Sequence, residues 1–213
     1  MNHPAELALH QYLENAVTGK SSMSQDTIKQ IGDDVMAAAQ RQFGGGNKRD
    51  KFGLRMSNVG RPTCQLWYDK NKPEVAVPLP TTFVMNMMIG DIVEAVFKAV
   101  LREANVKFEN SDTVSLEIDE KTTISGSYDL VMNDAVDDIK SASDWSYKYK
   151  FDSYESLHSG DSFGYVGQLA GYAKETKKKA GCRWVVNKAN GQFKYVPAHL
   201  DLDIEIKKKK KNI

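Results

Sequence analysis

Apolar residues recur at helical spacing in several stretches of the chain. Leu9 and Leu13 share one face of the first stretch, and Ile28 and Ile31 share a face of the second, which follows Ser24, a suitable N-cap. A hydrophobic period near that of the α-helix is typical of a helix with one buried face. The pattern therefore predicts four helices: residues 5–18, 24–43, 81–104 and 163–178.

The longest of these helices is expected to bury a stripe of apolar side chains. Glu94 lies at the edge of this stripe, and Lys98 follows four residues later, where it could form an ion pair on the same face. Glu94 is therefore either a helix-surface acid or a functional carboxylate. The predicted stripe consists of Ile89, Val93, Val96, Phe97 and Val100.

Short stretches of β character lie between and after the last two helices. Asn133 and Asp134 form a polar turn between two of them, and Asn190 with Gly191 turns the last pair. The first four are expected to form an antiparallel meander. The element order predicts an α/β fold, with a central mixed β-sheet flanked by helices. The predicted strands are residues 114–118, 122–125, 128–132, 136–140, 183–187 and 192–196.

Composition along the chain indicates three parts. Three consecutive glycines at 44–46 end the second predicted helix, so residues 1–48 are expected to form a mobile N-terminal helical arm on a flexible connector. Residues 49–200 form the main body, and residues 201–213 form a charged tail. The lysine run within that tail, residues 207–211, is typical of solvated, disordered chain.

Overall composition is that of a soluble globular domain. Of the 213 residues, 41% are hydrophobic and 27% are charged, and no apolar run approaches the roughly 18 residues that a membrane span requires. The first residues lack the layout of a signal peptide, so we expect a cytoplasmic protein without a membrane partner. Cys64 and Cys182 are far apart in the sequence, and two free thiols are the expected state.

Positive charge is concentrated locally although the net charge is only +1. A basic cluster of this kind is a candidate for contact with phosphate groups. Its members, all in the connector and the segment after it, are Lys48, Arg49, Lys51, Arg55 and Arg61.

The most informative chemistry lies in two of the predicted strands. Asp138 and Lys140 are two residues apart, so in a strand they point to the same face while Ile139 points to the other. The turn before them brings Asp129 alongside. Two carboxylates supply hard oxygen ligands for Mg²⁺ or Mn²⁺, which activate water against a phosphodiester. Lys140 could position that water, deprotonate it or neutralise developing charge, and the sequence leaves these roles open.

This pattern resembles the core of the PD-(D/E)XK nuclease superfamily, in which a glycine and an acid precede a short turn and an Asp-x-Lys motif. Three further segments resemble its RecB-like and phage exonuclease branch: Glu94 after Gly90 on the long helix, Gln168-x-x-x-Tyr172, and Ser57-x-x-Gly60. The resemblance covers about residues 52–196. It implies a restriction-endonuclease-like core and a metal-dependent deoxyribonuclease. Since this chain has only two cysteines, we expect no iron–sulfur cluster of the kind that some members carry.

The resemblance also implies roles for individual residues. The catalytic residues would be Asp129, Asp138, Lys140 and Glu94. The ligands of Mg²⁺ or Mn²⁺ would be Glu94, Asp129, Asp138 and the backbone carbonyl of Ile139. The DNA-binding residues would be Gln168, Tyr172, Arg55, Ser57, Arg61, Ser141, Ser143 and Lys188.

Each binding candidate also has an ordinary structural interpretation. Tyr172 is either a strand contact or a core tyrosine beside a surface glutamine, and Ser141 and Ser143 touch phosphate or cap a turn. Arg55, Ser57, Arg61 and Lys188 have the chemistry of phosphate contacts and equally of surface residues. Asp137, next to Asp138, is expected to be a solvated or strand-edge charge.

The function expected from this resemblance is exonucleolytic cleavage of DNA, in phage or bacterial recombination, replication or DNA degradation. An endonuclease on the same core and a catalytically silent DNA-binding module are the alternatives. Besides DNA, a single-strand annealing or replication protein is a suggested partner, and the location would be the bacterial host cytoplasm if the chain is phage-encoded. A monomer and an oligomer such as a ring-shaped trimer are both compatible with these residues.

Overall fold

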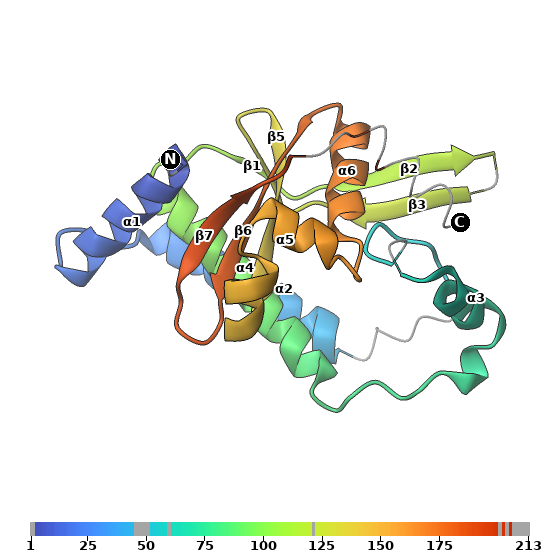
Figure 1. Ribbon diagram of the computed structural model, residues 1–213. Coiled ribbons are helices and arrows are strands. Elements are labelled where there is room, and N and C mark those ends of the chain that lie inside the picture. The colour runs from blue at the N-terminus through green and yellow to red at the C-terminus, as the bar shows by residue number, and fades with distance from the viewer. Residues whose placement is uncertain are drawn as a thin grey trace.

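A computed structural model of the chain describes residues 3–44, 52–58, 61–120, 122–199, 202 and 205. It is a mixed α/β structure in which a mixed sheet is flanked by helices (Figure 1). The helices are α1 (Pro4–Val17), α2 (Gln25–Phe43), α3 (Thr63–Asn71), α4 (Phe83–Glu103), α5 (Tyr154–Ser159) and α6 (Tyr165–Thr176), with helical turns η1 (Pro73–Val75) and η2 (Ser146–Lys150). The strands are β1 (Glu109–Asn110), β2 (Thr113–Asp119), β3 (Thr122–Ser127), β4 (Leu130–Met132), β5 (Ala135–Ala142), β6 (Lys179–Asn187) and β7 (Phe193–Pro197).

The main sheet has the strand order β1-β4-β5-β6-β7. Its central pair, β5 and β6, is parallel, and the other pairs are antiparallel. The parallel pair is joined through α5 and α6, as a crossover between parallel strands requires. The predicted mixed sheet flanked by helices is therefore confirmed.

The predicted four-stranded meander is wrong. Strands β2 and β3 pair with each other in a separate two-stranded sheet, and the short strand β1 occupies the position beside β4. The chain leaves the β3 ladder at Tyr128 and Asp129, where the Tyr128 ring is buried and the Asp129 carboxylate accepts a hydrogen bond from the backbone of β5. These two residues consequently connect the two sheets.

The four predicted helices are present as α1, α2, α4 and α6. Ser24 caps α2, since its hydroxyl oxygen accepts a hydrogen bond from the Thr27 N–H at 3.3 Å. Helices α3 and α5 were not predicted. Each is short and buries a single side chain, Leu66 and Leu157 respectively, so neither produces a clear hydrophobic period.

The expected N-terminal arm is packed against the body in its described part. Ala5 and Leu9 of α1 belong to the same buried cluster as Phe97 and Leu101 of α4 and Trp184 of β6. Helix α2 lies alongside α4 (Figure 1). The basic residues Lys48, Arg49 and Lys51 and the lysine run at 207–211 lie outside the described residues.

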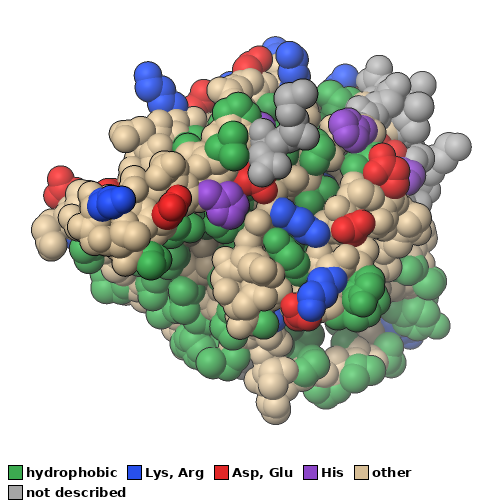
Figure 2. Space-filling model, turned by 60° about the vertical axis from the view of Figure 1, so that its left-hand side comes forward, with side chains coloured by type: hydrophobic (Ala, Val, Ile, Leu, Met, Phe, Trp, Pro, Cys, Tyr) green, Lys and Arg blue, Asp and Glu red, His purple; other side chains and the backbone are tan. Residues whose placement is uncertain are grey.

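Only part of the stripe predicted for α4 is buried. Phe97 is enclosed, but Ile89 and Val96 remain 36% and 41% exposed. The buried positions of α4 all lie in its C-terminal half, where Phe97 and Leu101 pack on the sheet. Figure 2 shows hydrophobic side chains gathered along the lower edge of the face in view. None of the described helices is long and apolar enough to cross a membrane.

Candidate active site

Strand β5 brings Asp138 and Lys140 together on one face. The Lys140 ammonium donates to Oδ1 of Asp138 at 2.7 Å, while Ile139 between them is buried in the cluster on the other face. This is the arrangement expected for residues two apart in a strand. Ile139, whose backbone carbonyl is a predicted metal ligand, lies between these two residues in the middle of β5.

Asp129 reaches the same point from the connection between β3 and β4. Its Oδ2 accepts a hydrogen bond from the Ile139 N–H at 2.6 Å, which fixes the carboxylate against the centre of β5. The structure therefore brings together Asp129, Asp138 and Lys140, three residues that the sequence singled out.

The pKa values of Asp129 and Lys140 are both raised at this centre. Burial, and then the neighbouring Asp138 carboxylate, raise the pKa of Asp129 to about 7. Burial alone would lower the pKa of the Lys140 ammonium, but the carboxylates of Asp138 and Asp129 outweigh it and raise that pKa above its ordinary value. Lys140 is consequently a protonated cation near both acids. The repulsion between the two carboxylates and their burial destabilise the folded protein.

We expect Asp129→Asn to stabilise the protein at about pH 8 in the presence of chelator. The pKa of Asp129 is about 7 in the folded protein and 3.8 for an ordinary aspartate, the value expected in the unfolded chain. The free energy of unfolding is therefore unaffected by this carboxylate below about pH 4 and falls as the pH rises to about 7. Because the two pKa values differ by about three, this loss in the free energy of unfolding is at most about 4 kcal/mol. Asparagine removes the charge and can still accept the Ile139 hydrogen bond.

Thermal melting of the two proteins at about pH 5 and pH 8 measures this effect. The melting temperature of the variant should exceed that of the wild type clearly at the higher pH and much less at the lower one. Equal melting temperatures at pH 8 would show that the Asp129 carboxylate carries no such cost.

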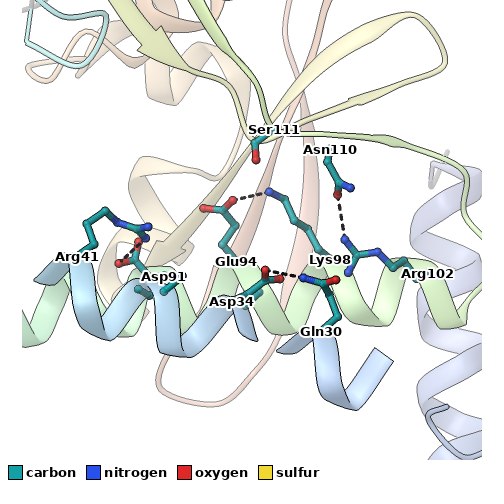
Figure 3. Close-up of a pocket in the computed structure, with 12 residues that line it drawn as sticks. Gln30, Asp34, Arg41, Asp91, Glu94, Lys98, Arg102, Asn110 and Ser111 are labelled. Atoms are coloured by element: carbon teal, nitrogen blue, oxygen red, sulfur yellow. Dashed lines mark hydrogen bonds and ion pairs between the residues drawn. The ribbon is translucent and has the colours of Figure 1, made fainter. Parts of the chain in front are cut away.

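Glu94, the third predicted carboxylate, is held by a lysine. The Lys98 ammonium lies 2.5 Å from Oε1 of Glu94 and is itself buried, with a side chain only 7% exposed. Both line a polar cavity of about 360 Å³ between α2 and α4, and Figure 3 shows the two side chains pointing toward each other. Glu94 still lies near enough to Asp129 to contribute to its raised pKa. The ion pair considered for Glu94 is therefore present, and Glu94 borders the acidic centre.

The side chains of the centre supply some of the ligands that a hard divalent cation requires. Within the described ranges, no group of three or more His, Cys, Asp or Glu side chains is arranged to hold a metal ion. Two buried carboxylates do converge, and Oδ2 of Asp138 has no hydrogen-bond partner among the described residues. Such paired acids suit Mg²⁺ or Mn²⁺, whose preferred ligands are oxygens. Glu94 could complete the set only after release from Lys98.

Helix α6 places Gln168 and Tyr172 beside these acids. The Gln168 amide donates to the Tyr172 hydroxyl at 3.0 Å. Tyr172 is a core residue, 2% exposed, and burial followed by the Asp138 carboxylate raises its pKa to about 12. The tyrosine hydroxyl is therefore a protonated group close to the acids, positioned by the glutamine one helical turn earlier.

Three of the predicted phosphate contacts gather at one cavity. Arg55, Ser57 and Arg61 line a space of about 780 Å³ together with Lys70, which was not predicted, and Phe83 of α4. Arg61 also lies 3.8 Å from the Asp69 carboxylate. The segment that lines this cavity contacts β3 and α6, because residue 55 bridges to Ser125 of β3 and Met56 packs where a side chain at Gly126 or Gly171 would stand.

The remaining candidates differ in position. Ser141 lies against Gly90, where its Oγ is 3.6 Å from the place of a Cβ, so α4 and β5 approach closely there. Ser143 caps the following turn by accepting from the Ser146 N–H at 3.2 Å. Lys188 is exposed and donates to Asn86 of α4 at 3.5 Å. Gly60 of the Ser-x-x-Gly motif lies outside the described residues.

The interpretation of Asp137 as a solvated charge is wrong. Its side chain is buried and accepts hydrogen bonds from the Cys182 N–H at 3.0 Å and the Trp184 indole at 3.1 Å. Burial raises its pKa to about 7 although both hydrogen bonds lower it. Asp137 faces the opposite side of β5 from Asp138 and ties β5 to β6. Its apolar neighbours Val136 and Ile139 were the available signal that this stretch is enclosed.

Sequence reasoning also missed Arg183 of β6. This arginine is 1% exposed and its Nε lies 3.6 Å from Oδ2 of Asp138. In the sequence it is one basic residue at the start of a predicted strand. Only the pairing of β5 with β6 brings it to the site.

Comparison with known proteins finds a structure with a similar fold but no matching family. The crystal structure of a protein designated SSO0001 is similar to this chain, with a TM-score of 0.50 and 14% sequence identity over 90% of this chain and 87% of that chain. At this identity the similarity shows the fold alone. No family model and no curated protein matches the chain.

Proposed function

We propose that this chain is a metal-dependent deoxyribonuclease of the PD-(D/E)XK type, with a restriction-endonuclease-like core, that hydrolyses phosphodiester bonds from DNA ends. One observation carries the proposal: the buried carboxylates of Asp129 and Asp138 converge beside the Lys140 ammonium. Two close acids destabilise each other unless a cation joins them, and such perturbed groups are characteristic of functional sites.

The proposed chemistry divides between these groups. Mg²⁺ or Mn²⁺, when bound by Asp129 and Asp138, supplies a Lewis acid that polarises the phosphorus centre and acidifies a water. The Ile139 carbonyl and, after its release from Lys98, Glu94 would complete the ligand set. Lys140 would remain on the face of Asp138, where its ammonium can orient the attacking water or neutralise the negative charge that develops on phosphate.

DNA would approach through the cavity lined by Arg55, Arg61 and Lys70. Guanidinium and ammonium groups bind phosphate oxygens without reading bases, so this surface favours contact with the backbone of any sequence. Ser57 lines the same cavity, and Tyr172 belongs to the same buried cluster as the neighbouring Met56. We therefore propose weak sequence preference.

The alternatives remain an endonuclease on the same core and a catalytically silent DNA-binding module. The silent module is disfavoured because binding of phosphate alone does not require two buried acids, one of which has a strongly raised pKa. A cytoplasmic location, and a partner of the single-strand annealing or replication class, belong to the same proposal.

Incubation with end-labelled linear duplex tests the proposed function. Products should shorten with time when Mg²⁺ or Mn²⁺ is supplied, and nothing should be released in excess chelator. Ca²⁺ should permit binding without cleavage, because its looser and longer coordination misplaces the attacking water. Cleavage at full rate in chelator would reject the metal-dependent assignment.

A further inference from the structure

Arg183 is a buried cation directly opposite Asp138. The two residues are partners in the parallel β5–β6 register, and their side chains are 3% and 2% exposed, Asp138 and Arg183 respectively. A charge enclosed in this way is costly without a partner of opposite sign. The Nε of Arg183 lies 3.6 Å from Oδ2 of Asp138, an ion pair without a hydrogen bond, so each group supplies the counter-charge of the other.

The guanidinium of Arg183 is held in place from its other side. Its Nη2 donates a hydrogen bond to the backbone carbonyl of Tyr165, the first residue of α6. The Tyr165 ring also lies against it, with the ring centroid 5.7 Å from Cζ. Because the side chain is enclosed and anchored to α6, any other position would separate a buried cation from its partners.

Lys140 contacts the other oxygen of Asp138, and its side chain is less enclosed than that of Arg183. Its ammonium lies 2.7 Å from Oδ1, but the lysine side chain is 23% exposed and has a flexible stem. Lys140 is therefore the more accessible of the two cations. The two oxygens of Asp138 consequently differ: Oδ1 accepts a hydrogen bond from the accessible lysine, whereas Oδ2 faces the enclosed guanidinium in an ion pair without a hydrogen bond.

We infer that Arg183 is the positioning residue of this centre: its guanidinium attracts Oδ2 of Asp138, so that Oδ1 stays directed toward Lys140 and the carboxylate keeps the orientation in which it would hold the cation. The inference rests on the proposed function for the identity of the substrate. The terminal torsion of an aspartate has a broad energy minimum. Without Arg183, only the partly exposed Lys140 would orient the Asp138 carboxylate.

Kinetics of Arg183 variants on end-labelled DNA test the inference. Arg183→Met should lower kcat by about 10- to 100-fold, since displacement of a reacting group by about 1 Å has an effect of this size, and should leave KM within about threefold. Arg183→Lys should recover part of kcat because an ammonium can still face Oδ2. Leu9→Ala is the matched control, because it removes a fully buried side chain from the cluster of α1 and α4 and should lower the melting temperature without changing kcat.

A thermal double-mutant cycle in chelator supplies a readout that is independent of activity. Arg183→Met removes the cation that faces Oδ2 of Asp138, and Asp138→Asn leaves the buried guanidinium without that carboxylate. The combined variant should therefore lose less melting temperature than the sum of the single losses. Additive losses, or an unchanged kcat in folded Arg183→Met, overturn the inference. If the wild type cleaves no DNA, it is the proposed function that fails, and the cycle alone then decides whether Arg183 holds Asp138.

Discussion

Replacing Asp138 by asparagine is expected to reduce DNA cleavage by about a thousandfold or more, the size of effect seen when a group that stabilises developing charge is removed. Asparagine keeps the volume of the side chain but provides one oxygen and no negative charge. Both Lys140 and Arg183 would lose their common counter-ion. Removing one member of a buried ion pair costs about 3–5 kcal/mol, so the variant should also be less stable than the wild type.

Asp137→Asn is the matched control for this experiment. Asp137 is the adjacent residue, is equally buried and also carries a carboxylate, but it faces Cys182 and Trp184 on the other side of β5. The asparagine variant should therefore retain cleavage, whatever it loses in stability. Initial rates measured below both melting temperatures separate the effect on cleavage from the effect on stability. Equal cleavage rates for Asp138→Asn and Asp137→Asn would contradict the proposed site.

The centre was predictable where it depends on local geometry. Asp138 and Lys140 meet because alternate residues of a strand share a face, a rule that needs no knowledge of the rest of the fold. Asp129 is brought near by the turn between β4 and β5, although its hydrogen bond to Ile139 replaces the strand pairing that was expected there. Spacing alone therefore sufficed for the three groups on which the proposal rests.

Contacts that depend on strand order could not be predicted. Arg183 reaches Asp138 only because β5 and β6 are parallel neighbours, and 45 residues separate the two in the sequence. The burial of Asp137 has the same origin, since its two hydrogen-bond donors are both on β6. A single sequence contains no signal for this register.

The periodicity of α4 was correct, but burial along it was not. The hydrophobic period extends over the whole helix, whereas the sheet and α1 cover only its C-terminal half. Lys98 illustrates the reverse error, because a lysine that looks solvated in the sequence is buried as the ion-pair partner of Glu94. Pattern identifies an apolar face but does not say how far the rest of the protein covers it.

Cleavage is expected to begin at DNA ends, so that linear duplex is degraded while covalently closed circles of the same sequence persist. The cationic cavity of about 780 Å³ is of the size that encloses a drug-sized ligand and is far too small for a length of duplex. We therefore propose that a strand enters this cavity from a free end before one of its phosphates reaches the acids of Asp129 and Asp138.

The comparison uses one plasmid in its closed form and after a single cut, at equal concentration with Mg²⁺, and follows both over time. Loss of the linear form to short products, with the circle intact, supports the exonuclease. Rapid nicking or linearisation of the circle would instead favour the endonuclease on the same core, since a free end would then be unnecessary. Addition of Asp138→Asn protein to both substrates identifies any contaminating nuclease, because that variant should leave both intact. The outcome with circles therefore decides between end-dependent and internal cleavage without changing the roles proposed for Asp129, Asp138 and Lys140.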